Sequence, residues 1–137
     1  MSFSSASVVK YLLLMTLRFS PSHMWVRIDG GEAVIGLSDY LQDQMGDITS
    51  LDLPDLGDVI RATRKMGTVE SDEASTSIEA PVSGEVVEVN ADAVDNPEVV
   101  NSDPFGGGWL LRVRLEDPGE LDELMEEEEY AELTTEV

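Results

Sequence analysis

Apolar and polar residues alternate in short runs along most of this chain, a pattern typical of half-buried β-strands separated by turns. Residues 25–28 alternate in this way, and the Asp-Gly-Gly sequence at 29–31 is a tight-turn signal that precedes a second apolar run. The pattern therefore predicts a mainly β protein. The predicted strands cover residues 25–28, 32–37, 48–53, 59–70, 75–79, 85–89 and 109–115.

Short helices are predicted between and after these strands. The first two predicted helices are each preceded by a residue whose side-chain oxygen can accept a hydrogen bond from a free backbone N–H group. The third begins at a proline and carries apolar residues at helical spacing, which predicts an amphipathic and acidic carboxy-terminal helix. The predicted helices cover 40–45, capped by Ser38 or Asp39, 91–94, capped by Asn90, and a stretch from Pro118 that includes Leu121, Leu124, Met125 and Tyr130.

A chain of 137 residues is long enough to form one domain that buries most of its unfolded surface. Short strands with frequent turns fit a small β-sandwich or barrel flanked by short helices. We expect residues 17–133 to form this domain, after an extension at 1–16 and before an acidic tail at 134–137.

The amino-terminal extension contains an apolar run at residues 8–17 that is interrupted by Lys10 and is too short to span a bilayer. No small-residue cleavage site follows this run, so we expect no secretory signal. We expect translation to start at Met15, with the preceding residues as upstream sequence; the alternative is a short added helix. A cytoplasmic monomer is the resulting expectation.

The charge of the chain excludes several classes of partner. The formal net charge is −21, which argues against nucleic acids and anionic membranes because both select for basic patches. Residues 116–137 hold eleven acids and no base, which leaves −21 + 11 = −10 for the rest. This segment is interpreted as a solvated acidic surface or, alternatively, as a docking surface for a basic partner.

The residue types also limit the possible chemistry. The chain has no cysteine and a single histidine, His23, which excludes disulfides, thiolate sites and a zinc site of the usual kind. Trp25 and Trp109 are expected in the core. The glycines at 106–108 are expected to form a loop and not a phosphate-binding turn, because no helix start follows them. The only basic cluster comprises Arg61, Arg64 and Lys65, which could pair with acids across the sheet or contact an acidic partner.

Three segments resemble the lipoyl-carrier domain of the glycine cleavage H-protein family. They are Gly57-Asp58-Val59, Glu70-Ser71-Asp72-Glu73-Ala74 and Ala80-Pro81-Val82-Ser83-Gly84-Glu85-Val86. Weaker matches follow in family order at 17–27, 35–40, 45–48, 99–105, 108–110 and 118–124. The resemblance implies a barrel-sandwich hybrid of two small antiparallel sheets with short flanking helices. It also implies a carrier-type or binding protein without an active site of its own.

The residue at the centre of this motif departs from the family pattern. The family reads Glu-Ser-Val-Lys-Ala at the tip of a hairpin, and lipoic acid is attached to that lysine as an amide. Here Glu73 stands at the lysine position, at family spacing from Gly57 and Pro81 without a gap. The chain has only two lysines, Lys10 and Lys65, and neither falls at the tip. We therefore expect no lipoate at Glu73.

A second departure lies near the amino terminus of the domain. The family usually reads His-Glu-Trp-Val there, whereas this chain reads His23-Met24-Trp25-Val26. The resemblance implies that His23 and Met24 face the loaded arm, and that the glutamate at this position helps to hold an aminomethyl group. A carboxylate attracts a cationic amine, but a thioether does not.

These residues support three hypotheses. The leading one is a non-lipoylated binding or regulatory module that docks on the glycine cleavage decarboxylase, the aminomethyltransferase or the lipoate-attaching enzymes. The second is a working carrier modified at Lys65. The third is a structural domain whose acidic tail mediates assembly. A cation site or an acid–base pair at Asp72 and Glu73 is less favoured than a solvated acidic tip, because an open turn offers no further ligand and no cleft.

Overall fold

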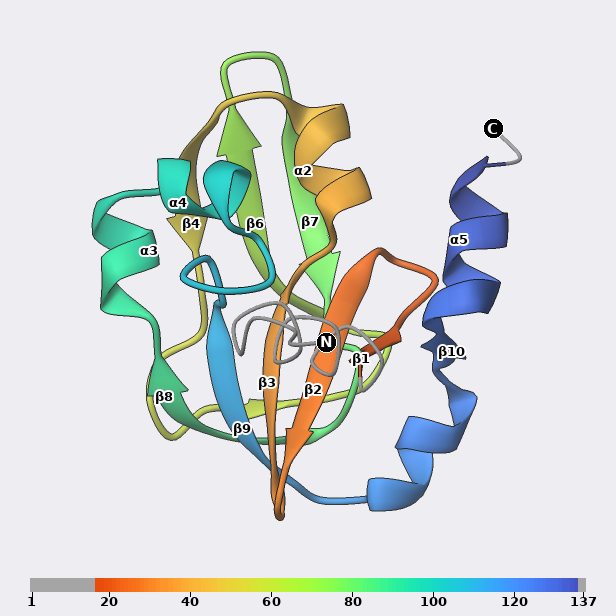
Figure 1. The fold of residues 1–137 in the computed structure, drawn as a ribbon. Helices are drawn as coiled ribbons and strands as arrows, with labels where there is room; N and C mark the ends of the chain where they lie inside the picture. Colours follow the sequence, from red (N-terminus) through yellow and green to blue (C-terminus); the bar gives the residue numbers. More distant parts are fainter. Residues whose placement is uncertain (1–16, 136–137) are drawn as a thin grey trace, which may run out of the picture.

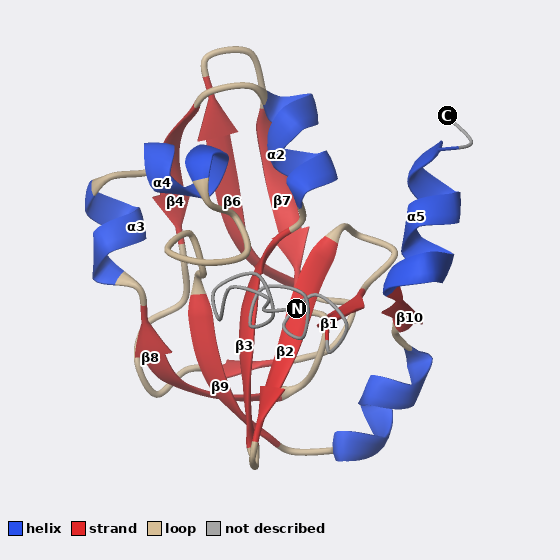
Figure 2. Ribbon diagram, in the orientation of Figure 1, coloured by secondary structure: helices blue, strands red, loops and turns tan. Residues whose placement is uncertain are grey.

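A computed structural model describes residues 17–135. The fold consists of two antiparallel sheets with short helices around them, so the predicted mainly β architecture is confirmed (Figures 1 and 2). The predicted extension at 1–16 and the end of the predicted tail lie outside the described residues.

The strands are β1 (Leu17–Phe19), β2 (Met24–Asp29), β3 (Glu32–Leu37), β4 (Ile48–Asp52), β5 (Val59–Ile60), β6 (Lys65–Ser71), β7 (Ser75–Glu79), β8 (Gly84–Val89), β9 (Leu111–Leu115) and β10 (Met125–Glu126). The helices are α2 (Asp39–Met45), α3 (Ala91–Asp95), α4 (Glu98–Ser102), the 3₁₀ helix η1 (Pro118–Glu123) and α5 (Glu127–Thr135).

The two sheets differ in size. Seven strands form the larger sheet in the order β10-β1-β2-β3-β9-β8-β5, and the smaller sheet has the order β4-β6-β7. Figure 1 shows α3 and α4 on the side of the molecule opposite to α5. The predicted tight turn is present, because Asp29 pairs with Glu32 across Gly30, which adopts a positive φ of 65°. Of the two predicted caps of α2, the structure has Ser38, whose side chain accepts a hydrogen bond from the backbone N–H of Leu41.

The predicted strand at 59–70 is wrong in one respect, because the chain forms two strands there instead of one. β5 pairs with β8 in the larger sheet, whereas β6 pairs with β4 and β7 in the smaller one. Between them the chain turns at Thr63, whose φ is 70° and whose N–H donates to the carbonyl of Ala80 over 2.8 Å. The turn carries the chain from one sheet to the other, which strand periodicity does not reveal.

The predicted continuous helix from Pro118 is also corrected. The segment divides into η1, β10 and α5, because Phe19 and Arg18 of β1 offer a free strand edge that pairs with Met125 and Glu126. An edge strand exposes unpaired N–H and C=O groups, and their pairing outweighs the helical preference of this acidic stretch. The predicted end of the domain at residue 133 lies within α5, which continues to Thr135.

The region around α3 and α4 departs from the sequence-based expectation in two ways. Asn90 precedes α3, but its side chain makes no capping hydrogen bond. It is buried and donates instead to the carbonyls of Gly107 and Trp109, over 2.9 and 2.7 Å. The helix α4 was not predicted. Its residue Val100 is fully buried in the core, so tertiary packing stabilises this short helix.

Two apolar clusters form the interior. The main cluster fills the space between the two sheets, and partly buried residues of α2, α4 and η1 pack against it. The second cluster packs α5 onto the larger sheet. Trp25 is fully buried in it, as predicted, whereas Trp109 is only half-buried at its edge. The buried residues of the second cluster are Leu17, Phe19, Trp25, Val34 and Tyr130.

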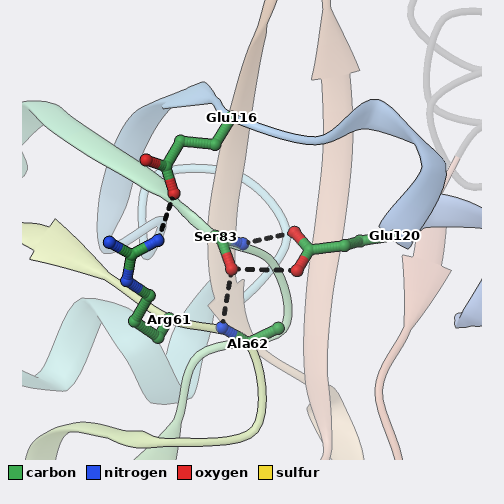
Figure 3. A network of polar contacts seen from close by, with 5 residues as sticks. All are labelled: Arg61, Ala62, Ser83, Glu116 and Glu120. Atoms are coloured by element: carbon green, nitrogen blue, oxygen red, sulfur yellow. Dashed lines mark hydrogen bonds and ion pairs between the residues drawn. The ribbon is translucent and has the colours of Figure 1, made fainter.

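A polar network ties the turn between β7 and β8 to the carboxy-terminal segment (Figure 3). The N–H and hydroxyl of the buried Ser83 donate to the two carboxylate oxygens of Glu120, over 2.8 and 2.9 Å. Ser83 Oγ also accepts from the backbone N–H of Ala62, within the crossing between the sheets. Arg61 forms an ion pair with Glu116 over 2.7 Å, which is one of the two predicted roles for a member of the basic cluster.

We expect Glu120→Ala to lower the free energy of unfolding by about 2 kcal/mol, because it leaves two buried donors of Ser83 without their acceptor. Urea unfolding followed by circular dichroism measures this change. Glu123→Ala is the matched control, since Glu123 lies in the same helix and its side chain is exposed. Equal losses in the two variants would contradict a structural role of the network.

Candidate functional site

The predicted hairpin tip is present between β6 and β7, and in Figure 1 its loop lies at the end of the hairpin, next to α2. Ser71 organises this turn. Its backbone N–H donates to the carbonyl of Ala74 over 2.8 Å, and its hydroxyl oxygen accepts from the N–H groups of Glu73 and Ala74 over 3.2 and 3.1 Å. Such a serine turn fixes the backbone locally. The tip is therefore a hydrogen-bonded turn at the end of the hairpin, with the side chains of Asp72 and Glu73 exposed.

Glu73 leans towards the carboxy-terminal end of α2. A Cβ atom added at Gly46, which caps that helix, would lie 3.8 Å from Glu73 Oε2. The carboxy-terminal end of a helix carries partial negative charge and favours a cation. The last turn of α2 contains no basic residue. The local field therefore favours a positive side chain at position 73, and a carboxylate gains nothing from it.

The acidic residues of the tip form no assembled ligand set. Glu70, Asp72 and Glu73 are all exposed, and no described basic side chain forms an ion pair with them. Within residues 17–135, no group of three or more acidic or histidine side chains is placed to hold a metal ion. In the same range, no helix combines the length and the apolar character needed to cross a membrane.

Lys65 lies at the other end of the hairpin. Because β6 begins at Lys65 and ends at Ser71, a distance of about 20 Å along the strand separates this lysine from the tip. Lys65 pairs with Glu79 in the register of the hairpin, and its side chain is exposed. The structure thus keeps the basic cluster apart from the turn that presents Glu73.

His23 and Met24 differ sharply in exposure. Met24 is fully buried in the main core, so its side chain does not face any arm on the surface, and that expectation for Met24 is corrected. A thioether suits this site because it is apolar and adaptable. His23 is half-buried at the turn before β2, with a positive φ of 71°. Only His23 of the two remains available at the surface.

His23 belongs to a polar cluster that the sequence did not predict. His23 Nδ1 and the Tyr130 hydroxyl share a hydrogen bond of 2.7 Å, and the same hydroxyl shares one of 2.6 Å with Ser38 Oγ. The ring of His23 also lies 4.8 Å from that of Tyr40, between centroids. Burial raises the pKa of the Tyr130 hydroxyl, although its bond to Ser38 acts in the opposite direction. The cluster anchors α5 to the start of α2, and no local sequence signal links residues so far apart.

Burial lowers the pKa of His23 from its ordinary value of 6.5, so the folded protein favours the neutral imidazole. The unfolded chain binds the proton near pH 6.5 and the folded chain only at lower pH. We therefore expect the free energy of unfolding to fall as the pH decreases from 6.5 through the folded pKa.

An NMR titration of this single histidine gives the folded pKa, and urea unfolding on both sides of pH 6.5 gives the slope. His23→Asn is the control, because asparagine tolerates a positive φ and cannot titrate in this range. A folded pKa at or above 6.5 would contradict the expectation.

Comparisons with known proteins agree with this fold. The family model for the glycine cleavage H-protein matches residues 17–137. The glycine cleavage system H protein of Vibrio campbellii is 47% identical over 116 residues, which cover 84% of this chain and 92% of that protein. The mitochondrial glycine cleavage system H protein 2 of Arabidopsis thaliana is 42% identical over 120 residues, or 88% of this chain and 77% of that protein. The crystal structure of a glycine cleavage system H protein from Mycobacterium marinum superimposes with a TM-score of 0.82 at 31% identity, and the match covers 88% of this chain and 98% of that one.

Proposed function

Because the chain belongs to the glycine cleavage H-protein family, we propose that it is a non-lipoylated member that acts as a binding or regulatory module. Members of this family are lipoyl carriers, so the chain is a carrier-type or binding protein and not an enzyme with an active site of its own. Its fold is the barrel-sandwich hybrid of the family.

The observation that supports the proposal is the presentation of Glu73 on an ordered and exposed turn between β6 and β7. Attachment of lipoate requires the ε-amine of a lysine, and a carboxylate cannot form that amide. The residues at the tip therefore do not fit the cofactor of the family. The neighbouring Glu70, Ser71 and Ala74 match the family motif, which would leave the recognition surface around position 73 in place.

The family interacts with the enzymes of glycine cleavage, and we propose that this chain docks on the same proteins. The candidates are the decarboxylase, the aminomethyltransferase and the enzymes that attach lipoate. A chain that docks without carrying the arm would occupy their binding surfaces without transferring a group. We further propose that it does so as a cytoplasmic monomer.

A carrier function through Lys65 is the second candidate, and the geometry of the hairpin argues against it. Lys65 is exposed and chemically able to accept an acyl group. However, it lies in a strand opposite Glu79 and not in a turn, about 20 Å along β6 from the tip. A ligase that recognises the tip would not reach it in the same binding mode.

The intact mass of the protein purified from its native host tests the proposal directly, with peptide mapping of any added mass. We expect the unmodified mass, because neither Glu73 nor its neighbours at the tip offers an amine. Incubation with a competent lipoate ligase and lipoate should also leave the mass unchanged. A lipoyl-sized addition that maps to Lys65 would overturn the proposal and restore the carrier function by another route.

A further inference from the structure

We propose that a groove between the β4–β5 connection and α3 binds a partner segment that presents an aliphatic side chain flanked by lysine or arginine. The groove has a volume of about 500 Å³ and is separate from the hairpin tip. This inference does not rest on the absence of lipoate. The residues that carry it are Leu53, Leu56, Val94, Asp52, Asp55 and Asp95, all of which line the groove.

The floor and walls of the groove are apolar. Leu53 and Val89 are partly buried and pack against the main core, so they hold the floor in place. Leu56 and Val94 also line the groove, and their exposed fractions are 70% and 40%, respectively. Exposed aliphatic side chains around a hollow favour a partner that covers them, because burial of apolar surface releases about 25 cal/mol per Å².

The charged side chains that line this groove are all acidic. Asp52, Asp55 and Asp95 are exposed, and no described side chain forms an ion pair or a hydrogen bond with their carboxylates. None of the residues that line the groove is basic. The basic cluster lines a different hollow, which meets the groove at Pro54. An incoming lysine or arginine would therefore find free acceptors on the rim.

The same charges exclude other occupants. A nucleic acid or an anionic membrane would be repelled by these acids and by the net charge of −21. The acidic helix α5 of a second copy would be repelled as well, since its first turn carries Glu127, Glu128 and Glu129. A basic and aliphatic segment is the partner whose charge and shape match the groove, and the net charge would also increase its rate of association.

The groove and the tip lie at opposite ends of β4. Ile48 begins the strand opposite Ser71 at the tip, whereas Asp52 ends it opposite Thr68 and beside the groove. A segment in the groove would therefore leave the tip uncovered. The groove can therefore contact a protein that also docks at the tip, or a protein that does not.

The probe for this site is a short synthetic peptide with one central leucine between lysine pairs, and its affinity for the full chain is measured by isothermal titration calorimetry. We expect the triple variant Asp52→Asn, Asp55→Asn, Asp95→Asn to weaken binding about tenfold, because loss of one exposed charge pair weakens binding only about twofold and three pairs are lost together. The matched control is Glu127→Gln, Glu128→Gln, Glu129→Gln, which removes the same charge from α5 and should change the affinity less than about twofold.

Separate variants test the contribution of the apolar side chains that line the groove. Leu56→Ser in the protein, and serine in place of the leucine in the peptide, should each weaken binding, and circular dichroism verifies that the protein variants are folded. Peptide-induced NMR shifts should centre on Leu53, Val89 and Val94. The proposal is overturned by the absence of binding, by equal losses in the two triple variants, or by shifts that centre away from the groove.

Discussion

A Glu73→Lys variant should become lipoylated by a competent lipoate ligase, whereas the wild-type protein should remain unmodified. The variant places an ε-amine on an exposed turn that Ser71 already orders through four hydrogen bonds. It also replaces an anion with a cation near the carboxy-terminal end of α2, where the local field favours positive charge. Intact mass spectrometry after incubation with ligase and lipoate gives the result as the fraction of protein that gains a lipoyl group.

The matched control for this experiment is Asp72→Lys, which makes the same change of charge one residue earlier in the same exposed turn. We expect little or no modification of that variant, because recognition depends on the position of the amine on the hairpin. Absence of lipoylation at both positions would show that the tip has lost the surface that the ligase recognises. In that case docking on the lipoate-attaching enzymes would no longer be a candidate for the function.

The largest loss of stability is expected for Trp25→Ala, which should lower the free energy of unfolding by about 4 kcal/mol. Trp25 is fully buried in the second cluster, and its Nε1–H donates to the carbonyl of Pro104 over 2.9 Å. The substitution removes this packing, leaves a cavity and frees a carbonyl from its donor. Urea unfolding followed by far-ultraviolet circular dichroism measures the change.

Trp109→Ala is the control, because Trp109 is only half-buried at the edge of the same cluster. We expect its cost to be clearly smaller than that of Trp25→Ala. If Trp25→Ala does not fold, Trp25→Phe keeps most of the apolar volume and isolates the loss of the bond to Pro104. Equal costs for the two tryptophan positions would contradict the division between interior and edge that the structure shows.

The hairpin tip illustrates how much of the candidate site was predictable. Ser71 to Ala74 lie between two runs with strand periodicity, and their place at a turn follows from that local pattern. The side chain of Glu73 points towards the end of α2 at Gly46, a segment that precedes the hairpin in the chain and lies next to its tip in the fold. The exposure of Asp72 and Glu73 was therefore predictable, but their electrostatic surroundings were not.

Met24 shows the opposite case. The resemblance to the family implied that Met24 and His23 face the same arm, but strand β2 begins at Met24 and His23 lies in the turn before it. Met24 enters the main core, while His23 precedes the strand in a left-handed conformation and reaches Tyr130. Sequence adjacency alone could not distinguish these two environments.

Local sequence is sufficient to predict those features of the protein that short-range interactions control. These are the mainly β architecture, the turn at Gly30, and a capping residue at Ser38 or Asp39 before α2. Periodicity and turn preferences act over a few residues, so a single segment contains the information that specifies them.

The features that depend on distant partners could not be predicted from local sequence. The chain changes sheets at Thr63 because β5 and β6 pair with different strands, and the carboxy-terminal segment divides because β1 has a free edge. The contact between His23 and Tyr130 joins residues 107 positions apart. Such contacts form when separate elements pack together, and their free energy outweighs the weak local preferences of each segment.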